Sequence, residues 1–390
     1  MSPNDRYTII LSFAAFVALL GSSLISPILP FYALAFGVPL TFVGALVSSF
    51  GLASVILDIP SGYFFDRFNA KILMILGLLL IFLSALICAF ALSYIVLLIG
   101  RVLGGIGYAV YTVTSFTCMG KIAPNDRRGR YMSFYLSMLL LGSVCGPAVG
   151  GIIGESFGLR VPFIVYGILS LLSCLLVHFG IGEAHITSSK NQMRTSLPSI
   201  TGIFKNYTLM AINLAIFGIF FIRMGVVSTL VPIFASENLG LSVQIIGGVL
   251  AITALINFLT MLPAGSLTDR YGRKKFLFAS LFITGLLTLA IPFANSSVSL
   301  IIIMAGLGFG FGFSGPIMAW VTDTASEGQL GIAMGIFRTM SDLGFIVGPL
   351  ILSYIASSSL DGISYEPFAL AGFLAIGTSI FILMAKERVK

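Results

Sequence analysis

Long apolar runs, more than any motif, decide what this chain can fold into. Roughly twelve of them alternate with short polar segments, and each is near the ~20 residues that a helix needs to cross the hydrocarbon of a bilayer. Mean hydropathy is +1.08 and only 9% of the residues are charged, too few to cover a soluble domain. The sequence therefore predicts an all-α polytopic membrane protein. Its twelve expected transmembrane helices lie near residues 7–36, 39–64, 71–92, 94–120, 131–154, 161–182, 207–235, 241–267, 276–294, 297–320, 332–356 and 366–385.

The cations predict the orientation of these spans. The first run is too long for a signal peptide, so we expect it to be retained as helix 1. With the amino terminus inside, only Arg160 falls in an outer loop, and this asymmetry follows the positive-inside rule. We therefore expect both termini in the cytoplasm and a multi-pass plasma-membrane location. The net charge of +7 then marks topology and does not indicate nucleic-acid binding. The inner cations are Arg6, Arg67, Lys71, Lys121, Arg127, Arg128, Arg130, Lys190, Arg194, Lys205, Arg270, Arg273, Lys274, Lys275, Lys386, Arg388 and Lys390.

Catalytic and metal-binding patterns are not legible in the sequence. The two histidines, His178 and His185, lie near the end of the sixth run and just after it, with no triad or carboxylate pair around them. The four cysteines lie inside spans without C-x-x-C spacing and are expected to pack as small apolar side chains. We expect no enzyme activity, no metal and no cofactor.

The sequence contains an internal repeat. A shift of about 203 residues aligns Gly62, Asp66 and Arg67 with Gly265, Asp269 and Arg270, and aligns "RVLGGIGYA" with "MAGLGFGFG". A shift of about 202 aligns "GSVCGP" with "GFIVGP". We therefore predict two pseudo-symmetric six-helix bundles. Residues 1–182 form the first, 183–206 a cytoplasmic linker and 207–390 the second.

These repeated words resemble the major facilitator superfamily of transporters, over essentially the whole chain. "GSLTDRYGRKK" is similar to that superfamily's loop signature and includes Gly272 and Arg273, whereas the first copy has Asn69 and Ala70 at those two positions. "RVLGGIG" resembles its helix 4 arginine motif. "GSVCGPAVGG" and "SPILPFYALAFG" resemble motifs of the drug:proton antiporter branch. The resemblance implies alternating access around a midplane site between the halves.

The loop copies predict a pair of cytoplasmic latches. Glycine permits the tight turn, and a carboxylate can bind the partly positive amino terminus of a helix in the opposite half. The resemblance implies helix 11 for Asp66 and helix 5 for Asp269, with the adjacent cations facing anionic lipid. The alternative is that these charges only mark topology. The latch residues are Gly62, Asp66, Arg67, Gly265, Asp269, Arg270, Gly272 and Arg273.

The helix 5 motif predicts a close helix contact. Gly142, Gly146 and Gly150 share one face, and Pro147 removes a backbone hydrogen bond and kinks the helix. We expect this face, with Gly151, at the seam between the halves.

Five charges lie within spans, where each is costly unless it is paired or faces water. They are Asp58, Arg101, Arg223, Arg338 and Asp342. Asp58 and Arg338 are at similar depths, and in the facilitator fold their helices face each other. We therefore predict that they pair when the cytoplasmic side is closed and that Asp58 is protonated when they part. A permanent pair of Arg338 with Asp342 is the alternative, and for Arg101 packing and proton coupling both stay open.

A substrate cavity is expected to contain arginine and aromatic side chains. Helix 1 has no acid, unlike several drug antiporters, so the lining suits apolar or weakly anionic solutes. Ordinary packing remains an alternative for each aromatic. The candidate residues are Arg101, Tyr108, Tyr111, Phe217, Phe220, Phe221 and Arg223.

The sequence as a whole predicts a secondary transporter that exports amphiphilic small molecules, as multidrug efflux antiporters do, with the proton gradient as its energy source. Its partners are the substrate, protons and the lipid bilayer, and we expect it to act as a monomer. A transporter of one metabolite, such as a sugar or an organic anion, is the main alternative. A receptor or scaffold that transports nothing is a third, although buried charges and paired latches have no evident use there.

Overall fold

A computed structural model of the chain describes residues 3–122, 128–182, 206–325, 330–357, 363–385 and 387. The predicted linker lies outside these residues except for Asn206, and so does His185. For Gly62 and Asp66 the backbone alone is described. Seven of the inner cations also fall outside the described ranges, namely Arg127, Lys190, Arg194, Lys205, Lys386, Arg388 and Lys390.

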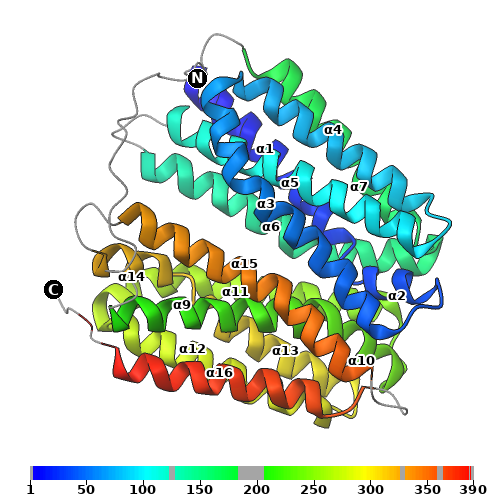
Figure 1. The fold of residues 1–390 in the computed structure, drawn as a ribbon, viewed down its shortest axis with the longest axis vertical. Helices are drawn as coiled ribbons and strands as arrows, with labels where there is room; N and C mark the ends of the chain where they lie inside the picture. The colour runs from blue at the N-terminus through cyan, green and yellow to red at the C-terminus, as the bar shows by residue number, and fades with distance from the viewer. Residues whose placement is uncertain are drawn as a thin grey trace. The chain divides into compact units, whose positions relative to one another are not determined.

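The described part of the chain is helical and contains no β-strand (Figure 1). Within it, twelve helical segments are long and apolar enough to cross a membrane, which confirms the predicted fold class. The α-helices are α1 (Pro3–Leu24), α2 (Leu29–Leu34), α3 (Leu40–Arg67), α4 (Ala70–Ala89), α5 (Tyr94–Ile122), α6 (Arg128–Phe157), α7 (Val161–Gly180), α9 (Tyr207–Phe220), α10 (Val231–Glu237), α11 (Val243–Tyr271), α12 (Arg273–Ala290), α13 (Ser297–Gly312), α14 (Ile317–Thr324), α15 (Leu330–Ala356) and α16 (Glu366–Met384). A π-helix, η2 (Phe221–Leu230), joins α9 to α10, and a 3-10 turn, η3 (Ile291–Phe293), follows α12.

Proline divides two of the apolar runs for which the sequence predicts a single helix. The run near 7–36 divides because α1 ends at Leu24 and α2 begins at Leu29, with Pro30 in its first turn. The run near 297–320 divides between α13 and α14, where Pro316 precedes the second helix. Proline lacks the backbone donor that a helix interior needs, but it fits the first turn, so each helix restarts beside it.

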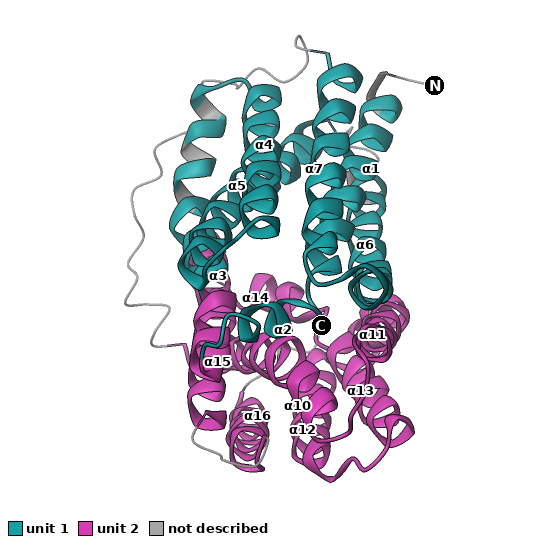
Figure 2. Ribbon diagram, turned by 90° about the vertical axis from the view of Figure 1, so that its right-hand side faces the viewer, with its two compact units in different colours: residues 1–38, 49–193 teal, residues 39–48, 194–390 magenta. Residues whose placement is uncertain are grey.

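The helices form two compact units, coloured separately in Figure 2. Unit 1 contains residues 1–38 and 49–193, and unit 2 contains 39–48 and 194–390. Helix α3 is therefore shared between them. Its first residues group with unit 2 because Thr41 Oγ1 donates to Ser357 Oγ at 2.9 Å and Ser48 Oγ donates to the carbonyl of Ile346 at 2.5 Å.

Helix pairing inside each unit follows the same plan. In unit 1, α1 packs on α6 and α7, and α4 packs on α5 and α7. In unit 2, α15 packs on α9 and η2, and α12 packs on α13 and α16. Each unit thus pairs its first and fifth spans and sets its third span between its fourth and sixth.

Individual contacts between helices also recur at equivalent positions of the two units. A Cβ atom added to Gly105 on α5 would meet the carbonyl oxygen of Phe50, and one added to Gly308 on α13 would meet that of Thr253. Both members of the second pair lie 203 positions after those of the first. Only glycine permits this approach of two backbones in each unit, so the repeated glycines set the same helix crossing twice.

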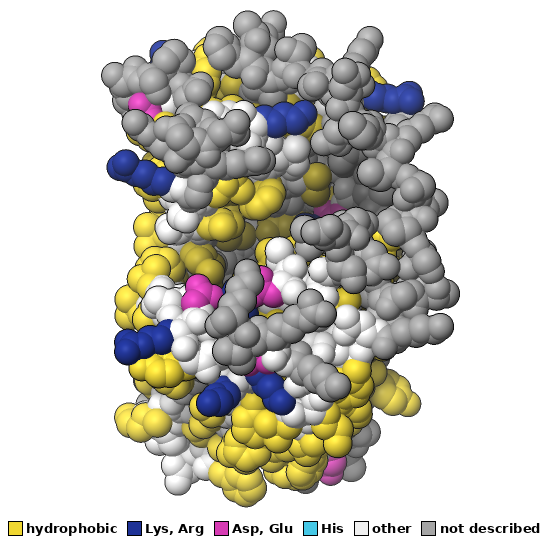
Figure 3. All heavy atoms as spheres, turned by 90° about the vertical axis from the view of Figure 1, so that its left-hand side faces the viewer, with side chains coloured by type: hydrophobic (Ala, Val, Ile, Leu, Met, Phe, Trp, Pro, Cys, Tyr) yellow, Lys and Arg dark blue, Asp and Glu magenta, His cyan; other side chains and the backbone are white. Residues whose placement is uncertain are grey.

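The outer surface suits a lipid solvent. On α4, Leu76, Leu79 and Leu83 are exposed along one face, whereas Leu78 and Ile81 are buried on the other. Lys, Arg, Asp and Glu side chains reach the surface among hydrophobic ones on the face drawn in Figure 3. An exposed leucine stripe opposite a buried one is what a membrane span inside a helix bundle requires.

Candidate functional site

Glycine makes the turn of the second-half latch at Gly272. This residue has φ +93° and separates α11 from α12. A side chain is strained at that angle, so the position favours glycine. Gly265 lies inside α11, where an added Cβ would meet nothing within 4 Å, and Gly62 lies inside α3. The prediction that glycine allows the turn therefore holds only for Gly272, and the other two are helical residues.

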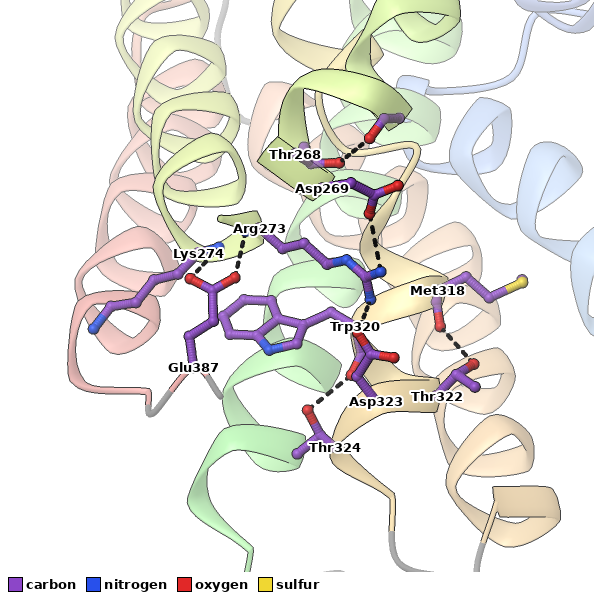
Figure 4. Close-up of polar contacts among 11 residues, drawn as sticks. Thr268, Asp269, Arg273, Lys274, Met318, Trp320, Thr322, Asp323, Thr324 and Glu387 are labelled. Atoms are coloured by element: carbon purple, nitrogen blue, oxygen red, sulfur yellow. Dashed lines mark hydrogen bonds and ion pairs between the residues drawn. The ribbon is translucent and has the colours of Figure 1, made fainter. Parts of the chain in front are cut away.

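Arg273 is the centre of an ion-pair cluster in unit 2 (Figure 4). Its Nη2 lies 3.1 Å from Oδ1 of Asp269, four residues earlier at the end of α11, and its Nη1 lies 2.5 Å from Asp323 Oδ2 on α14. The Arg273 side chain is only 18% exposed. The prediction that it faces anionic lipid is therefore wrong, because two carboxylates of the protein already neutralise it.

Glu387 caps the helix that begins at Arg273 (Figure 4). Its carboxylate accepts hydrogen bonds from the backbone N–H groups of Arg273 and of Lys274, the latter at 3.3 Å. These N–H groups have no partner within the helix, and the amino terminus carries a partial positive charge, so an acid is stabilising there. This contact leaves no signature in the sequence, because residues more than 110 positions apart form it and no motif marks Glu387.

In the first copy of the latch motif, an asparagine N-cap replaces the glycine at the turn between the two helices. Asn69, at the position of Gly272 in the repeat, is the N-cap of α4, and its Oδ1 accepts from the N–H of Lys71 at 2.9 Å. Ala70 replaces Arg273 and cannot form an ion pair. Asp66 and Arg67 lie in the last turn of α3. The predicted contacts of Asp66 and Asp269 with helices of the opposite half stay predictions.

The glycine face of the helix 5 motif packs against α1 of its own unit. A Cβ on Gly142 would lie 2.9 Å from the nitrogen of Leu20, and one on Gly146 would lie 2.9 Å from the Leu20 oxygen. One on Gly150 would lie 2.7 Å from the carbonyl carbon of Leu24. The expectation that this face lies at the seam between the halves is therefore wrong. Small residues one turn apart let α1 and α6 approach closely inside unit 1.

The same contact recurs in unit 2. Gly344 and Gly348 on α15 face the backbones of Phe217 and Phe221, with 3.0 Å from the Gly344 Cβ position to the Phe221 nitrogen. Pro147 and Pro349 lie inside their helices at matching places, one residue after the second glycine of each motif copy. Phe221 is 2% exposed and belongs to this packing, so its assignment to a substrate cavity is wrong.

Arg101 lies on α5 and is enclosed by unit 1. Its guanidinium carbon is 4.4 Å from the centre of the Phe50 ring, and the residue is 8% exposed. Its Nε is buried and has no hydrogen-bond partner among the described residues. The ring of Tyr108 lies 5.5 Å from that of Phe50 and is partly exposed, so these three side chains are brought together.

Tyr111 belongs to the core of unit 1. It is 1% exposed, and its backbone nitrogen would lie 2.8 Å from a Cβ on Gly77 of α4. Its assignment to a substrate cavity is therefore wrong, because the close packing of α4 and α5 encloses it.

Arg223 lies in the π-helix η2, close to the middle of the span Tyr207–Glu237. Its guanidinium carbon is 4.8 Å from the centre of the Phe311 ring, and its Nε is buried without a hydrogen-bond partner among the described residues. An arginine at such a depth costs about 2.5–3.5 kcal/mol on insertion scales. The contact with Phe311 offsets about 0.5–2 kcal/mol of that.

The remaining span charges belong to different units. Arg338 Nε lies 4.0 Å from Asp342 Oδ2 on the same helix, at the limit of an ion pair, with the Arg338 side chain 59% exposed. This contact matches the alternative interpretation of Arg338. Asp58 belongs to unit 1 and both other residues to unit 2, so a pair between Asp58 and Arg338 stays a prediction.

Metal chemistry has no visible basis in the described ranges. They contain no group of three or more His, Cys, Asp or Glu side chains that could hold a metal ion. The four cysteines are free, and three of them are buried.

Twelve spans in two repeated bundles, with charges inside the spans, define a multi-pass helical membrane protein of the transporter class. The Major Facilitator Superfamily model matches residues 11–258 and again 212–390. The chain therefore belongs to the Major Facilitator Superfamily.

Two relatives and one solved structure that resemble this chain share 25% sequence identity or less with it. An uncharacterized MFS-type transporter of Methanocaldococcus jannaschii is 25% identical over 91% of this chain and 92% of its own length. Multidrug resistance protein 2 of Bacillus subtilis is 24% identical over 99% of this chain and 97% of its own. The crystal structure of a D-xylose-proton symporter covers 100% of this chain and 99% of its own, with a TM-score of 0.80 and 19% identity. The last similarity shows the fold alone.

Proposed function

We propose that this transporter is a proton-driven exporter of amphiphilic small molecules, an efflux antiporter of the multidrug type. The observation that carries the proposal is the complete helix 5 motif, Gly142 to Gly151, whose glycines are used in the α1–α6 contact. This motif resembles that of proton-coupled exporters. The similarity to Multidrug resistance protein 2 over nearly the whole chain supports the same proposal.

Proton coupling falls to the charges inside the spans. Asp58 and Asp342 are the acids that we assign to the coupling steps, and Arg101 and Arg338 are the cations. A carboxylate in a membrane can carry a proton when a conformational change removes its cationic neighbour. The proton gradient supplies the energy, and the proposal requires no cofactor.

The second-half latch holds the cytoplasmic end of unit 2 in one arrangement. Arg273 ties the start of α12 to Asp323 on α14, and Glu387 ties the same turn to the chain after α16. We place both termini in the cytoplasm of a plasma-membrane protein that acts as a monomer. Asp269, which is 67% exposed, remains available to a further positive partner during the cycle.

Transport of one organic anion as a metabolite is the second candidate. Arg101 and Arg223 favour it because neither has a carboxylate partner among the described residues. Both candidates use the same fold and differ in the breadth of the substrate range.

Everted membrane vesicles test the proposal. Respiration acidifies the lumen of such vesicles, and an antiporter exchanges a proton out of the lumen for each substrate that enters. We expect added amphiphiles of unrelated skeletons to raise the luminal pH only when the protein is present. A rise in luminal pH with one metabolite alone would support the second candidate. A fall in luminal pH, or no change with any amphiphile, would contradict export.

A further inference from the structure

Among the residues that the structure describes, Arg223 is a cation inside a membrane span with no anionic neighbour. It lies 16 residues after the start and 14 before the end of the span Tyr207–Glu237, far from the polar headgroups. Within the described residues it has neither an ion pair nor a hydrogen bond. Its guanidinium group instead makes a cation-π contact with the Phe311 ring. An intramembrane charge of this type marks a functional site when no protein group neutralises it.

The fold does not require an arginine here. Gly142 meets Phe16 and Leu20 in unit 1, and Gly344 meets Phe217 and Phe221 in unit 2. Phe217 and Phe221 each lie 201 positions after their counterpart in unit 1. The same offset makes Ser22 the repeat equivalent of Arg223. Unit 1 therefore has an uncharged serine at the equivalent position of α1, so the repeated helix packing does not explain the arginine of unit 2.

The surroundings of Arg223 combine aromatic and polar side chains on one face. Residues at helical spacing are partly exposed along this segment, whereas the residues between them are buried on the side that packs against α15 and α16. The partly exposed residues are Phe217, Phe220, Arg223, Met224, Val227 and Ser228. Two rings precede the guanidinium by one and two turns, which suits a molecule with an apolar body and an anionic end.

The backbone at this point is a π-helix of ten residues, Phe221–Leu230. The hydroxyl of Thr229 donates to the carbonyl of Met224, five residues earlier, at 2.7 Å. Gly225 lies against Gly348 of α15, with 2.8 Å from its Cβ position to the Gly348 carbonyl carbon. π-Helical turns are rare and frequently mark functional sites, and this one carries Arg223.

We propose that Arg223 is the charge-recognition residue for the substrate, and that the preferred substrates are amphiphiles with one carboxylate or sulfonate group. Two parallel N–H···O bonds from the guanidinium hold the anionic group, and Phe217 and Phe220 contact the apolar body. This inference rests on the proposed export function, whose substrate class it narrows from amphiphiles in general to anionic ones.

Two matched probes test the inference. 1-Anilinonaphthalene-8-sulfonate and N-phenyl-1-naphthylamine share an aryl-amine skeleton, and only the first carries an anion. The chain has a single tryptophan, Trp320, nine residues after Phe311 in unit 2, so energy transfer from Trp320 reports probe that binds near this tryptophan in the purified protein. Titration gives a dissociation constant for each probe in the wild type and in each variant.

We expect Arg223→Met to weaken binding of the sulfonate at least about tenfold and to change binding of the neutral probe by less than about twofold. Arg223→Lys keeps the charge but loses the planar fork, so it weakens sulfonate binding by an intermediate factor and covers the case in which the methionine variant does not fold. Arg160→Met, which removes an exposed arginine of unit 1, is the matched control and retains the preference for the sulfonate. Equal loss of both probes in Arg223→Met, or no loss of either, would overturn the inference.

Transport separates this inference from the export proposal. If the sulfonate binds through Arg223 but a pH gradient moves neither probe, recognition stands and export fails. If the gradient moves both probes and Arg223→Met leaves their ratio unchanged, export stands and recognition by Arg223 fails.

Discussion

Gly150→Ala tests where the glycine face of α6 lies. The three atoms nearest to a Cβ on Gly150 all belong to the backbone of Leu24, and its carbonyl carbon is 2.7 Å away. Ordinary contact begins at 3.4 Å and the Leu24 carbonyl oxygen is nearer still, so α1 and α6 must separate locally by more than about 0.7 Å, because a backbone cannot rotate aside. Overpacking of this kind costs about 1–3 kcal/mol, which corresponds to a melting temperature roughly 2–12 °C lower for a unit of this size.

The assay is thermal unfolding of the purified protein, followed by the loss of its monodisperse peak at one fixed heating rate, since unfolding in detergent is often irreversible. Gly377→Ala on α16 is the matched control, because a Cβ there meets nothing within 4 Å. We expect the control to melt at or above the wild-type temperature, since alanine is the better helix former. A Gly150→Ala protein that melts with the control but no longer transports would refute packing on α1 as the role of this face.

Three further predictions concern the turn at Gly272, the cap that Glu387 provides and the predicted pair of Asp58 with Arg338. Gly272→Ala forces a side chain into φ +93° and toward Glu387, and should lower the free energy of unfolding by about 1–3 kcal/mol; an unchanged denaturant midpoint would argue against the turn geometry. Glu387→Ala removes the cap of α12 and should destabilise the protein by about 0.5–2 kcal/mol, with faster amide hydrogen exchange confined to the first turn of that helix; uniform exchange would contradict the cap. Asp58→Arg should abolish transport, and adding Arg338→Asp should restore part of it; a double variant as inactive as the single one, with both inserted, would remove the support for their pairing.

Much of the fold was legible in the sequence because the constraints are local or repeated. Span length and the shift of about 203 residues predicted two six-helix bundles, and the contacts of Gly105 and Gly308 recur at that shift. The breaks beside Pro30 and Pro316 were missed, since proline within an apolar run can either kink a helix or end it.

The candidate site was less predictable because its contacts depend on packing. The sequence placed Arg273 beside a carboxylate but gave no sign that Asp323 and Glu387 converge on the same turn. Phe221 and Tyr111 are buried whereas the aromatic residues near them are partly exposed, because α15 covers the first and α4 covers the second. Residue type alone does not reveal this difference in burial. Arg223 was visible as a charge inside a span, whereas the π-helix that carries it leaves no signature in composition or spacing.

Flux into proteoliposomes tests proton-driven export most directly. The purified protein is reconstituted in zwitterionic vesicles with an acidic lumen, the membrane potential is clamped with potassium and valinomycin, and uptake of 1-anilinonaphthalene-8-sulfonate and N-phenyl-1-naphthylamine is followed. The sulfonate is ionised at every pH used, so the gradient alone cannot trap it, and protein-free vesicles give the background. We expect the probes to accumulate against their concentration gradient while protons leave the lumen, and a protonophore to abolish the accumulation. Accumulation that survives the protonophore, or probe movement in the same direction as protons, would contradict the account.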